Sequence, residues 1–339
     1  MNRFVVALIV MGAVAGAALW HGHGLLNQTL ALDGDALPLE IRSGETLQGV
    51  AARLHAEGVI DAPERLVWAA RLSGRDLDIK AGEYEMHLGM RASELIDMLV
   101  AGRTVLHAMT IVEGWTYTQL RRELARHPAI VQTLDGVDDE RLMARLGKPD
   151  KHPEGWFFPD TYLFAKGTTD FAFLERAMRT MDAHLAQAWE LRDSGLPYAT
   201  PYEALVMASI IEREARVVAE RSIIAGVFVR RLERRMRLQT DPTVMYGLGP
   251  DFKGPLRTVH LRTDTPYNTY TRNGLPPTPI ALPGASALRA AVQPANGDAL
   301  FFVSRGDGTH KFSATLEEHN RAVRRYILGK GDDGNGTER

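Results

Sequence analysis

The clearest pattern of apolar positions lies at residues 204–216, in the run A-L-V-M-A-S-I-I-E-R-E-A-R. Pro201 precedes this run and no Gly or Pro interrupts it, which predicts a helix that begins near Pro201. At about 100° per residue, one broad face collects the apolar positions 206, 207, 210, 211, 217 and 218. Glu214 falls in the middle of this face, and Glu212 lies about 200° around the helix, pointing nearly the opposite way.

The position of Glu214 predicts a proton donor. A carboxylate in an apolar stripe is costly to ionise, so the pKa of Glu214 is expected to rise. A raised carboxyl pKa is what a general acid needs near neutral pH. The same pattern is also typical of a glutamate that pairs with a basic residue and only stabilises the fold, and the helix periodicity does not separate these two interpretations.

The N-terminus carries a second strong pattern, because residues 4–20 form an apolar run without a charge. Such a run can span a bilayer at the short end of the usual range. Arg3 precedes it and the next Lys or Arg is Arg42, so the positive-inside rule predicts that residues 1–3 are cytoplasmic and the rest is exported. A cleaved signal peptide is the alternative, since two triplets within residues 13–17 resemble cleavage sites, but the long apolar run favours an uncleaved anchor.

After a predicted linker at residues 21–38, the pattern predicts a small α+β unit at residues 39–103. Apolar positions 47, 50, 51 and 54 recur with helical spacing, a second helix is predicted at 62–72, and Ser93 is expected to cap a third. Tyr84 and Met86 are expected on one side of a strand at 82–86. The phrase I-R-S-G-E-T-L-Q-G-V-A resembles the opening of LysM-type modules, which bind N-acetylglucosamine polymers, although any strand–turn–helix unit gives a similar pattern.

A larger mixed α/β domain is predicted at residues 104–328, followed by a disordered tail at 329–339. A strand is expected at 104–112, and the helix that carries Glu214 is expected to be followed by further helix at 220–235. Asp241 is expected as the N-cap and Pro242 as the first residue of another helix. A hairpin is expected at 300–304 and 310–312.

Composition narrows the possible functions. The chain has 339 residues, 45% of them hydrophobic, and a net charge of -2, which argues against a nucleic-acid-binding protein dominated by phosphate contacts. It has no cysteine, which excludes thiol catalysis, cysteine-ligated metals and disulfides. No Gly-rich phosphate loop, H-E-x-x-H or G-x-S-x-G motif is present, so no metal or cofactor is expected.

Two runs combine aromatic, hydroxyl and carboxyl groups: E-G-W-F-F-P-D-T-Y at 154–162 and T-P-Y-N-T-Y at 265–270. Sugars present C–H faces that stack on aromatic rings and hydroxyls that bind polar side chains, so this composition suits a carbohydrate groove. Packing within loops is the alternative. The candidate glycan-binding residues are Glu154, Trp156, Glu212, Gln239, Tyr246, Tyr267, Asn268 and Tyr270.

These two runs occur in one order with M-A-S-I-I-E-R-E (207–214), R-L-Q-T-D-P-T-V-M-Y-G (237–247), G-L-P-P-T-P-I (274–280) and H-K-F…H-N (310–320). As an ordered set over about residues 4–328, they resemble the endolytic murein transglycosylases, or YceG-like family. The resemblance implies an α+β protein with a single N-terminal transmembrane helix, a small LysM-like subdomain and a larger mixed α/β catalytic domain. The second Glu of the family's E-x-E motif is catalytic and matches Glu214. The family often has Thr at the next position, where this chain has Ala215, so the tuning of Glu214 is expected to differ.

The resemblance further implies a bacterial inner-membrane protein whose C-terminal domain faces the periplasm. Such proteins cut nascent peptidoglycan strands between N-acetylmuramic acid and N-acetylglucosamine, leave 1,6-anhydro-N-acetylmuramic acid ends and terminate strand elongation. Cell-wall synthases such as penicillin-binding proteins are the implied protein partners.

One glutamate suffices for this reaction because the nucleophile is the C6 hydroxyl of the same muramic acid ring. A hydrolytic muramidase, the first alternative, would need a second carboxylate, for which Asp160, Asp241 and Asp264 are the candidates. The second alternative is a scaffold protein that binds peptidoglycan without cutting it.

Overall fold

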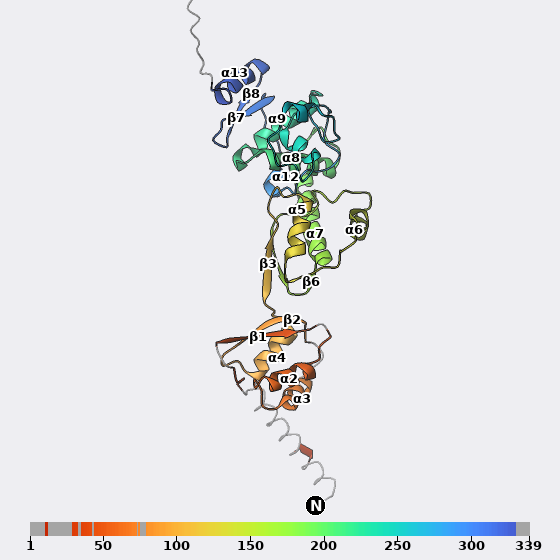
Figure 1. Ribbon diagram of the computed structural model, residues 1–339, viewed down its shortest axis with the longest axis vertical. Coiled ribbons are helices and arrows are strands. Elements are labelled where there is room, and N and C mark those ends of the chain that lie inside the picture. Colours follow the sequence, from red (N-terminus) through yellow and green to blue (C-terminus); the bar gives the residue numbers. More distant parts are fainter. Residues whose placement is uncertain are drawn as a thin grey trace, which may run out of the picture. The chain divides into compact units, whose positions relative to one another are not determined.

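The computed structural model describes residues 11–12, 29–32, 35–42, 44–72, 74 and 79–329 (Figure 1). The predicted membrane span, apart from residues 11–12, lies outside the described residues, as do most of the predicted linker and the predicted tail after Gly329. Within the part of the chain that is described, no helix has the length and apolar character needed to cross a membrane.

The described residues divide into two compact units. The first comprises the residues up to Ala108 together with Leu163–Thr168, and the second comprises Met109–Tyr162 and the residues from Thr169 onward. The short segment Leu163–Thr168 joins the first unit because the Lys166 ammonium donates to the Glu83 carboxylate at 2.7 Å.

In the first unit, strand β1 (Ala36–Ile41) pairs antiparallel with β2 (Gly82–His87), and Leu39 lies opposite Tyr84. Helices α2 (Leu47–Ala56) and α3 (Pro63–Leu72) lie between these strands in the chain, and α4 (Ala92–Ala101) follows them. The predicted helical stripe is confirmed, since all four of its positions in α2 are buried. Tyr84 and Met86 are fully buried on the same side of β2, as the alternation predicted.

The expected cap of the third helix is wrong. Helix α4 has Arg91 as its N-cap, and Ser93 lies inside the first turn. The Glu94 carboxylate accepts the backbone N–H of Arg91 at 2.8 Å, so a glutamate three residues after the cap satisfies the N–H of the cap residue.

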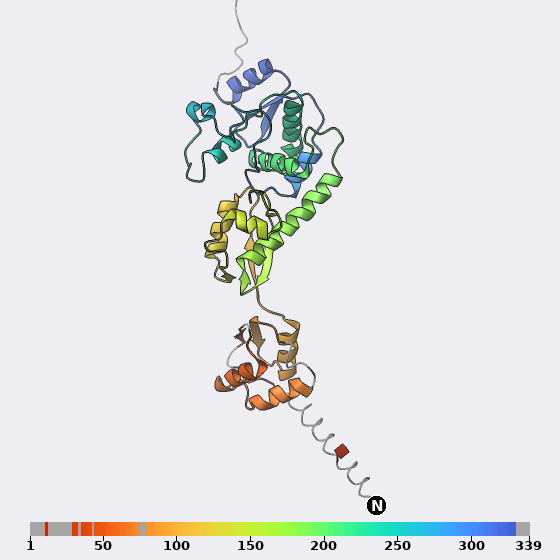
Figure 2. The ribbon, with the colours of Figure 1, turned by 90° about the vertical axis from the view of Figure 1, so that its right-hand side faces the viewer.

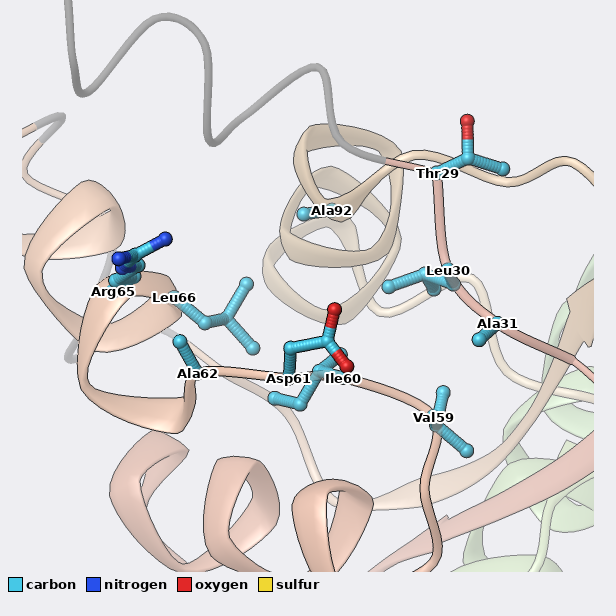
Figure 3. Close-up of a pocket in the computed structure, with 10 residues that line it drawn as sticks. All are labelled: Thr29, Leu30, Ala31, Val59, Ile60, Asp61, Ala62, Arg65, Leu66 and Ala92. Carbon is cyan, nitrogen blue, oxygen red and sulfur yellow. The ribbon is translucent and has the colours of Figure 1, made fainter.

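Part of the predicted linker packs onto the first unit. The Leu30 N–H donates to the Met90 carbonyl at 2.8 Å and the Ala31 N–H donates to the Val59 carbonyl at 3.0 Å. Leu30, Ala31 and Arg65 of α3 line a cavity of about 50 Å³. Figure 3 shows the side chains that line it. Leu30 and Leu32 are buried and belong to the hydrophobic core of this unit, whereas Thr29 and Ala31, before and between them, are exposed.

The second unit is mainly helical and carries short strands. The strand pairs that follow β2 in the described chain are β3 (Leu106–Thr110) with β5 (Thr161–Ala165), β4 (Ile130–Val131) with β6 (Thr168–Thr169), and β7 (Phe301–Ser304) with β8 (His310–Ser313). The division between the units falls within β3, β5 and β6. The predicted C-terminal hairpin is confirmed, because β7 and β8 pair antiparallel.

In the second unit, the mostly buried helix α8 (Pro201–Glu214) packs against four others. These four are α7 (Asp170–Glu190), α9 (Arg221–Glu233), α10 (Asp241–Gly247) and α12 (Ala285–Val292). Figure 1 shows α8 beside α9 and α12, and Figure 2 shows the same ribbon turned by 90°. The remaining helices are α5 (Tyr117–Arg126), α6 (Asp139–Arg145), α11 (Thr258–Arg262) and α13 (Leu316–Tyr326).

Helix α8 differs from the prediction in two respects. All eight residues from Ala204 to Ile211 are buried, so the helix is enclosed on every side and has no separate apolar face. It also ends at Glu214, and Val218, expected on the apolar face, is 62% exposed in a short 3-10 turn, η1 (Val218–Glu220). This break reverses the chain, so that Arg221 at the start of α9 contacts Glu212 of α8 at 2.6 Å.

Close packing around α9 makes Gly226 a test of the fold. A Cβ added at Gly226 would lie 2.3 Å from the backbone oxygen of Ala295. Alanine favours a helix over glycine by about 1 kcal/mol, but this contact forces a backbone shift. We expect Gly226→Ala to lower the free energy of unfolding by about 1–3 kcal/mol, measured by urea denaturation.

Gly49→Ala in α2 is the matched control. A Cβ at Gly49 would meet only side-chain atoms, at 3.7 Å, so this variant should be as stable as the parent or more stable by up to about 1 kcal/mol. Equal stability of Gly226→Ala and the parent protein would contradict the packing described for α9.

Candidate active site

Glu214 is the last residue of α8 and its side chain is half-buried. Burial raises the pKa of Glu214, as predicted from its place among apolar residues. The Thr240 hydroxyl donates to Glu214 Oε2 at 2.7 Å and acts in the opposite direction, because it stabilises the ionised form. The nearby negative charge of Asp241 raises the pKa further. The net effect is a carboxyl that holds its proton more tightly than an ordinary glutamate.

Thr240 is a site residue that sequence reasoning missed. It is the N-cap of α10, and Asp241 is the first residue of that helix, so the expected N-cap role of Asp241 is wrong. The Thr240 side chain makes no capping bond, and its hydroxyl donates to Glu214. Asp241 Oδ1 instead accepts the Tyr270 hydroxyl at 2.6 Å, which places Tyr270 beside the same site.

A turn at residues 268–271 holds the backbone of Thr240 and Gln239 by hydrogen bonds. Thr269 Oγ1 accepts the Thr240 backbone N–H at 3.1 Å, and the Thr269 carbonyl accepts the Gln239 N–H at 3.1 Å. Gln239 is exposed and has a φ of 51°, in the left-handed region that non-glycine residues rarely adopt. Backbone strain of this kind is common next to functional sites, where the surrounding contacts hold it in place.

The buried Asn268 side chain holds the backbone of residues 260–270 by hydrogen bonds. It is 0% exposed. Its side-chain nitrogen donates to the carbonyls of His260, Leu261 and Thr263, and its side-chain oxygen accepts the Tyr270 N–H at 2.8 Å. Both ends of the amide are therefore engaged within the protein, and Asn268 acts on the site by positioning the segment that carries Tyr267 and Tyr270.

A second group forms around Glu154, which is 2% exposed. Glu154 Oε1 accepts the backbone N–H of Tyr117 at 2.9 Å, and Oε2 accepts the Tyr246 hydroxyl at 3.1 Å. The Tyr246 ring meets the Tyr267 ring edge-on, with 4.9 Å between their centres. Burial raises the pKa of Glu154 to about 7, so the carboxyl changes charge near neutral pH.

Trp156 is buried in the second unit. Its ring stacks on Tyr202 with 5.7 Å between centres, and the Lys148 ammonium lies 4.1 Å from the indole centre. Tyr202 also lines a cavity of about 380 Å³ that the Pro-rich segment 274–277 lines as well. Trp156 therefore supports the wall of this cavity, and its indole face is already in use.

Glu212 lies apart from Glu214, as the helix geometry predicted. Its side chain is 4% exposed. Oε1 accepts the Arg221 guanidinium at 2.6 Å and Oε2 accepts the Gly284 N–H at 3.0 Å. Burial raises the pKa of Glu212, while the Gly284 N–H and the Arg221 charge oppose the rise. Both oxygens are taken, so this carboxylate joins α8, α9 and the start of α12.

The three aspartates considered as a second carboxylate have separate surroundings. Asp160 accepts the N–H of the next residue at 2.7 Å. Asp264 pairs with Arg272 at 3.0 Å, and this hydrogen bond lowers the pKa of Asp264 to about 2. Asp241 is the one of the three whose charge acts on Glu214. Across the described part of the chain, no cluster of three His, Asp or Glu residues is arranged to hold a metal ion.

His310 and Glu220 form a further pair that the sequence analysis did not connect. His310 Nδ1 lies 2.7 Å from Glu220 Oε2, and the His310 backbone N–H donates to Glu220 Oε1 at 3.0 Å. The His310 charge lowers the pKa of Glu214, so this pair lies within electrostatic reach of the candidate acid. The two residues are far apart in sequence, and no local motif links them.

The Thr240 hydroxyl provides a direct test of the electrostatics of Glu214. Thr240→Val removes the hydrogen bond to the ionised carboxylate, so the pKa of Glu214 should rise. The measurement is an NMR titration of protein labelled with carbon-13 at the glutamate carboxyl groups, with Glu214→Gln to assign the signal. Thr240→Ser, which keeps a hydroxyl, should leave the pKa close to that of the parent; an unchanged or lower pKa in Thr240→Val would refute the role of this bond.

Comparison with known proteins gives consistent results. The chain matches the profile of the YceG-like family over residues 39–325. It is 32% identical to the endolytic murein transglycosylase of Bacillus subtilis (strain 168), covering 94% of this chain and 92% of that protein. It is 26% identical to the endolytic murein transglycosylase of Streptococcus pneumoniae serotype 2, covering 97% of this chain and 66% of that protein. A crystal structure of a YceG-like protein from Listeria monocytogenes shares 32% identity and a TM-score of 0.56, covering 86% of this chain and 100% of that one.

Proposed function

The chain belongs to the YceG-like family, and from this premise we propose that it is an endolytic murein transglycosylase that cuts the glycan strands of peptidoglycan. The observation that carries the proposal is Glu214, a half-buried carboxyl with a raised pKa and a hydroxyl partner at the end of a buried helix. A rigid helix on one side and the Thr240 contact on the other hold this group in one orientation, as general acid–base catalysis requires.

The finer reaction that we propose needs this single carboxyl. Glu214 protonates the glycosidic oxygen between N-acetylmuramic acid and N-acetylglucosamine, and the bond from C1 to that oxygen breaks. The C6 hydroxyl oxygen of the same muramic acid ring then bonds to C1, and its proton passes to the Glu214 carboxylate. The product is a 1,6-anhydro-N-acetylmuramic acid end, and the acid is restored for the next cycle.

The surroundings of the other carboxylates support a one-acid reaction. Glu212 is bound to Arg221 and Gly284, so it is not available to a substrate. An intramolecular hydroxyl makes a second carboxylate unnecessary because it is already held beside the reacting carbon. A hydrolytic muramidase, the alternative, would use Asp241, whose carboxylate lies at the same site and accepts the Tyr270 hydroxyl.

We propose that the glycan binds along α10 and along the loop at residues 265–270, which packs on α10. Tyr246, Tyr267 and Tyr270 come from these two segments, Gln239 directly precedes the N-cap of α10, and each of the four is exposed or half-buried. Asn268 contributes by holding the loop, since its amide is engaged internally.

We also propose that the first unit is a LysM-like module that binds the same polymer. The elements β1, α2, α3 and β2 follow one another in this unit in the order strand, helix, helix, strand. A cavity of about 360 Å³ is lined by residues of the β1–α2 connection and of the α3–β2 connection. Binding by this unit alone would describe the scaffold alternative. The predicted anchor at residues 4–20 would hold the protein in the bacterial inner membrane with its C-terminal part in the periplasm, beside synthases such as penicillin-binding proteins.

Substitution of Glu214 tests the reaction class and the acid together. The full-length protein and its Glu214→Gln variant are incubated with nascent, uncrosslinked glycan strands, and the new ends are identified by mass spectrometry. Loss of one general acid–base group should lower the rate of anhydro-end formation by at least about 100-fold. Glu317→Gln is the control, because Glu317 is an exposed carboxylate that pairs with Arg321 on α13. This variant should cut glycan at the parental rate.

The products separate the alternatives. Ordinary reducing ends would indicate a hydrolase, and Asp241→Asn would then be the next variant. Binding of glycan without release of any end, in both the parent and Glu214→Gln proteins, would indicate a scaffold.

A further inference from the structure

Glu154 is a buried carboxyl that the proposed proton transfers do not use. Its side chain lies where three segments meet: its own turn, the first residue of α5 and the last turn of α10. The turn is pressed against the Pro-rich segment, because a Cβ added at Gly155 would lie 2.5 Å from the Pro279 ring. Gly155 has a φ of 86°, so glycine is required here for conformation as well as for space.

Burial of the Glu154 carboxyl lowers the stability of the fold, and its two hydrogen bonds indicate the role that offsets this cost. Burying an ionisable group costs free energy that apolar side chains of similar size do not incur. One Glu154 oxygen accepts the backbone N–H of Tyr117, which has no partner within α5 because Tyr117 is the first residue of that helix. The other oxygen accepts the Tyr246 hydroxyl. The first bond anchors the carboxyl to the protein, and the second fixes the direction of a half-buried tyrosine.

Tyr246 in turn contacts the loop at residues 265–270 through Tyr267. The Tyr246 ring meets the Tyr267 ring edge-on at 4.9 Å between centres, and the Tyr267 hydroxyl pairs with Thr278 Oγ1 at 2.9 Å. A Cβ at Gly247 would come within 3.0 Å of Tyr267, so α10 and the loop are in close contact. Tyr246 also lies about 9 Å along α10 from Thr240, which bonds to Glu214, so one helix carries both groups.

We infer that Glu154 is a positioning residue of the glycan site, which holds the Tyr246 side chain, and through it the Tyr267 side chain, in the arrangement that the substrate meets. The inference rests on the proposed function and adds a residue that the reaction steps do not involve. It assigns Glu154 to substrate binding through a tyrosine, in place of direct contact with the glycan, because the carboxyl itself is almost fully covered.

The charge of Glu154 connects this role to pH. Burial raises its pKa to about 7, while the Tyr117 N–H, the Tyr246 hydroxyl, the Gly155 N–H and the positive charge of Arg213 on α8 act in the opposite direction. Above pH 7 the ionised carboxylate accepts the Tyr246 hydroxyl strongly, and below pH 7 the neutral acid accepts it weakly. The KM for glycan should therefore rise as the pH falls below about 7.

The experiment compares the full-length parent, Glu154→Gln, Tyr246→Phe and the double variant. Steady-state cutting gives kcat and KM between pH 5.5 and 8.5, and thermal unfolding gives stability. Each single variant should raise KM by about 3–10-fold, the effect of one lost hydrogen bond, with kcat changed less than about twofold. The double variant should be no weaker than the weaker single variant, because both substitutions remove the same bond. In Glu154→Gln the pH dependence of KM near pH 7 should disappear.

A second readout keeps failure of this inference distinct from failure of the proposed reaction. Glycan binding is measured by calorimetry with the same substitutions in the Glu214→Gln background, where no cutting is needed. A 3–10-fold loss of affinity there would support the positioning role even if the parent made ordinary reducing ends. Lower thermal stability of Glu154→Gln with unchanged affinity, KM and pH profile would overturn the inference, as would additive effects in the double variant. Tyr246→Phe decides the question if Glu154→Gln does not fold.

Discussion

The hydrogen bond from Thr240 to Glu214 is the interaction on which the site depends. It joins the end of helix α8, whose central residues are buried, to the start of α10, and it opposes the rise in the Glu214 pKa that burial causes. A carboxyl with no such partner would stay neutral over a wider pH range and would be a poor base in the second half of the reaction. Burial and one hydroxyl together keep Glu214 able to give a proton and take it back.

The remaining polar contacts keep these two elements in register. Glu212, Arg221 and Gly284 lock the end of α8 to α9 and α12, and Asn268 and Thr269 hold the turn beneath Thr240. The Glu212, Asn268 and Thr269 side chains all have hydrogen-bond partners inside the protein, which is what a site needs when a small displacement of the acid costs a large factor in rate. The E-x-E motif therefore combines one glutamate for chemistry in the proposed function and one for structure.

The site also shows how a charged group can be used without contact with substrate. Glu154 lies at the other end of α10 from Thr240, and its bonds go to a helix N-terminus and a tyrosine hydroxyl. A polar group that is fully bonded can fix the direction of a neighbouring side chain more sharply than apolar packing does, because hydrogen bonds are directional and packing contacts are not.

The sequence by itself determined the local elements and the residue most suited to proton transfer. Apolar spacing located α2, α8 and the β7–β8 hairpin, and the position of Glu214 predicted its raised pKa, since both depend on near neighbours in the chain. Only the tertiary structure decided where α8 ends, that Thr240 and not Asp241 is the cap and bonds to Glu214, and that Glu212, Asn268 and Trp156 are engaged internally. These outcomes depend on groups far apart in the sequence, such as Arg221 with Glu212 or Tyr246 with Glu154, and periodicity carries no information about which distant group satisfies a buried polar atom.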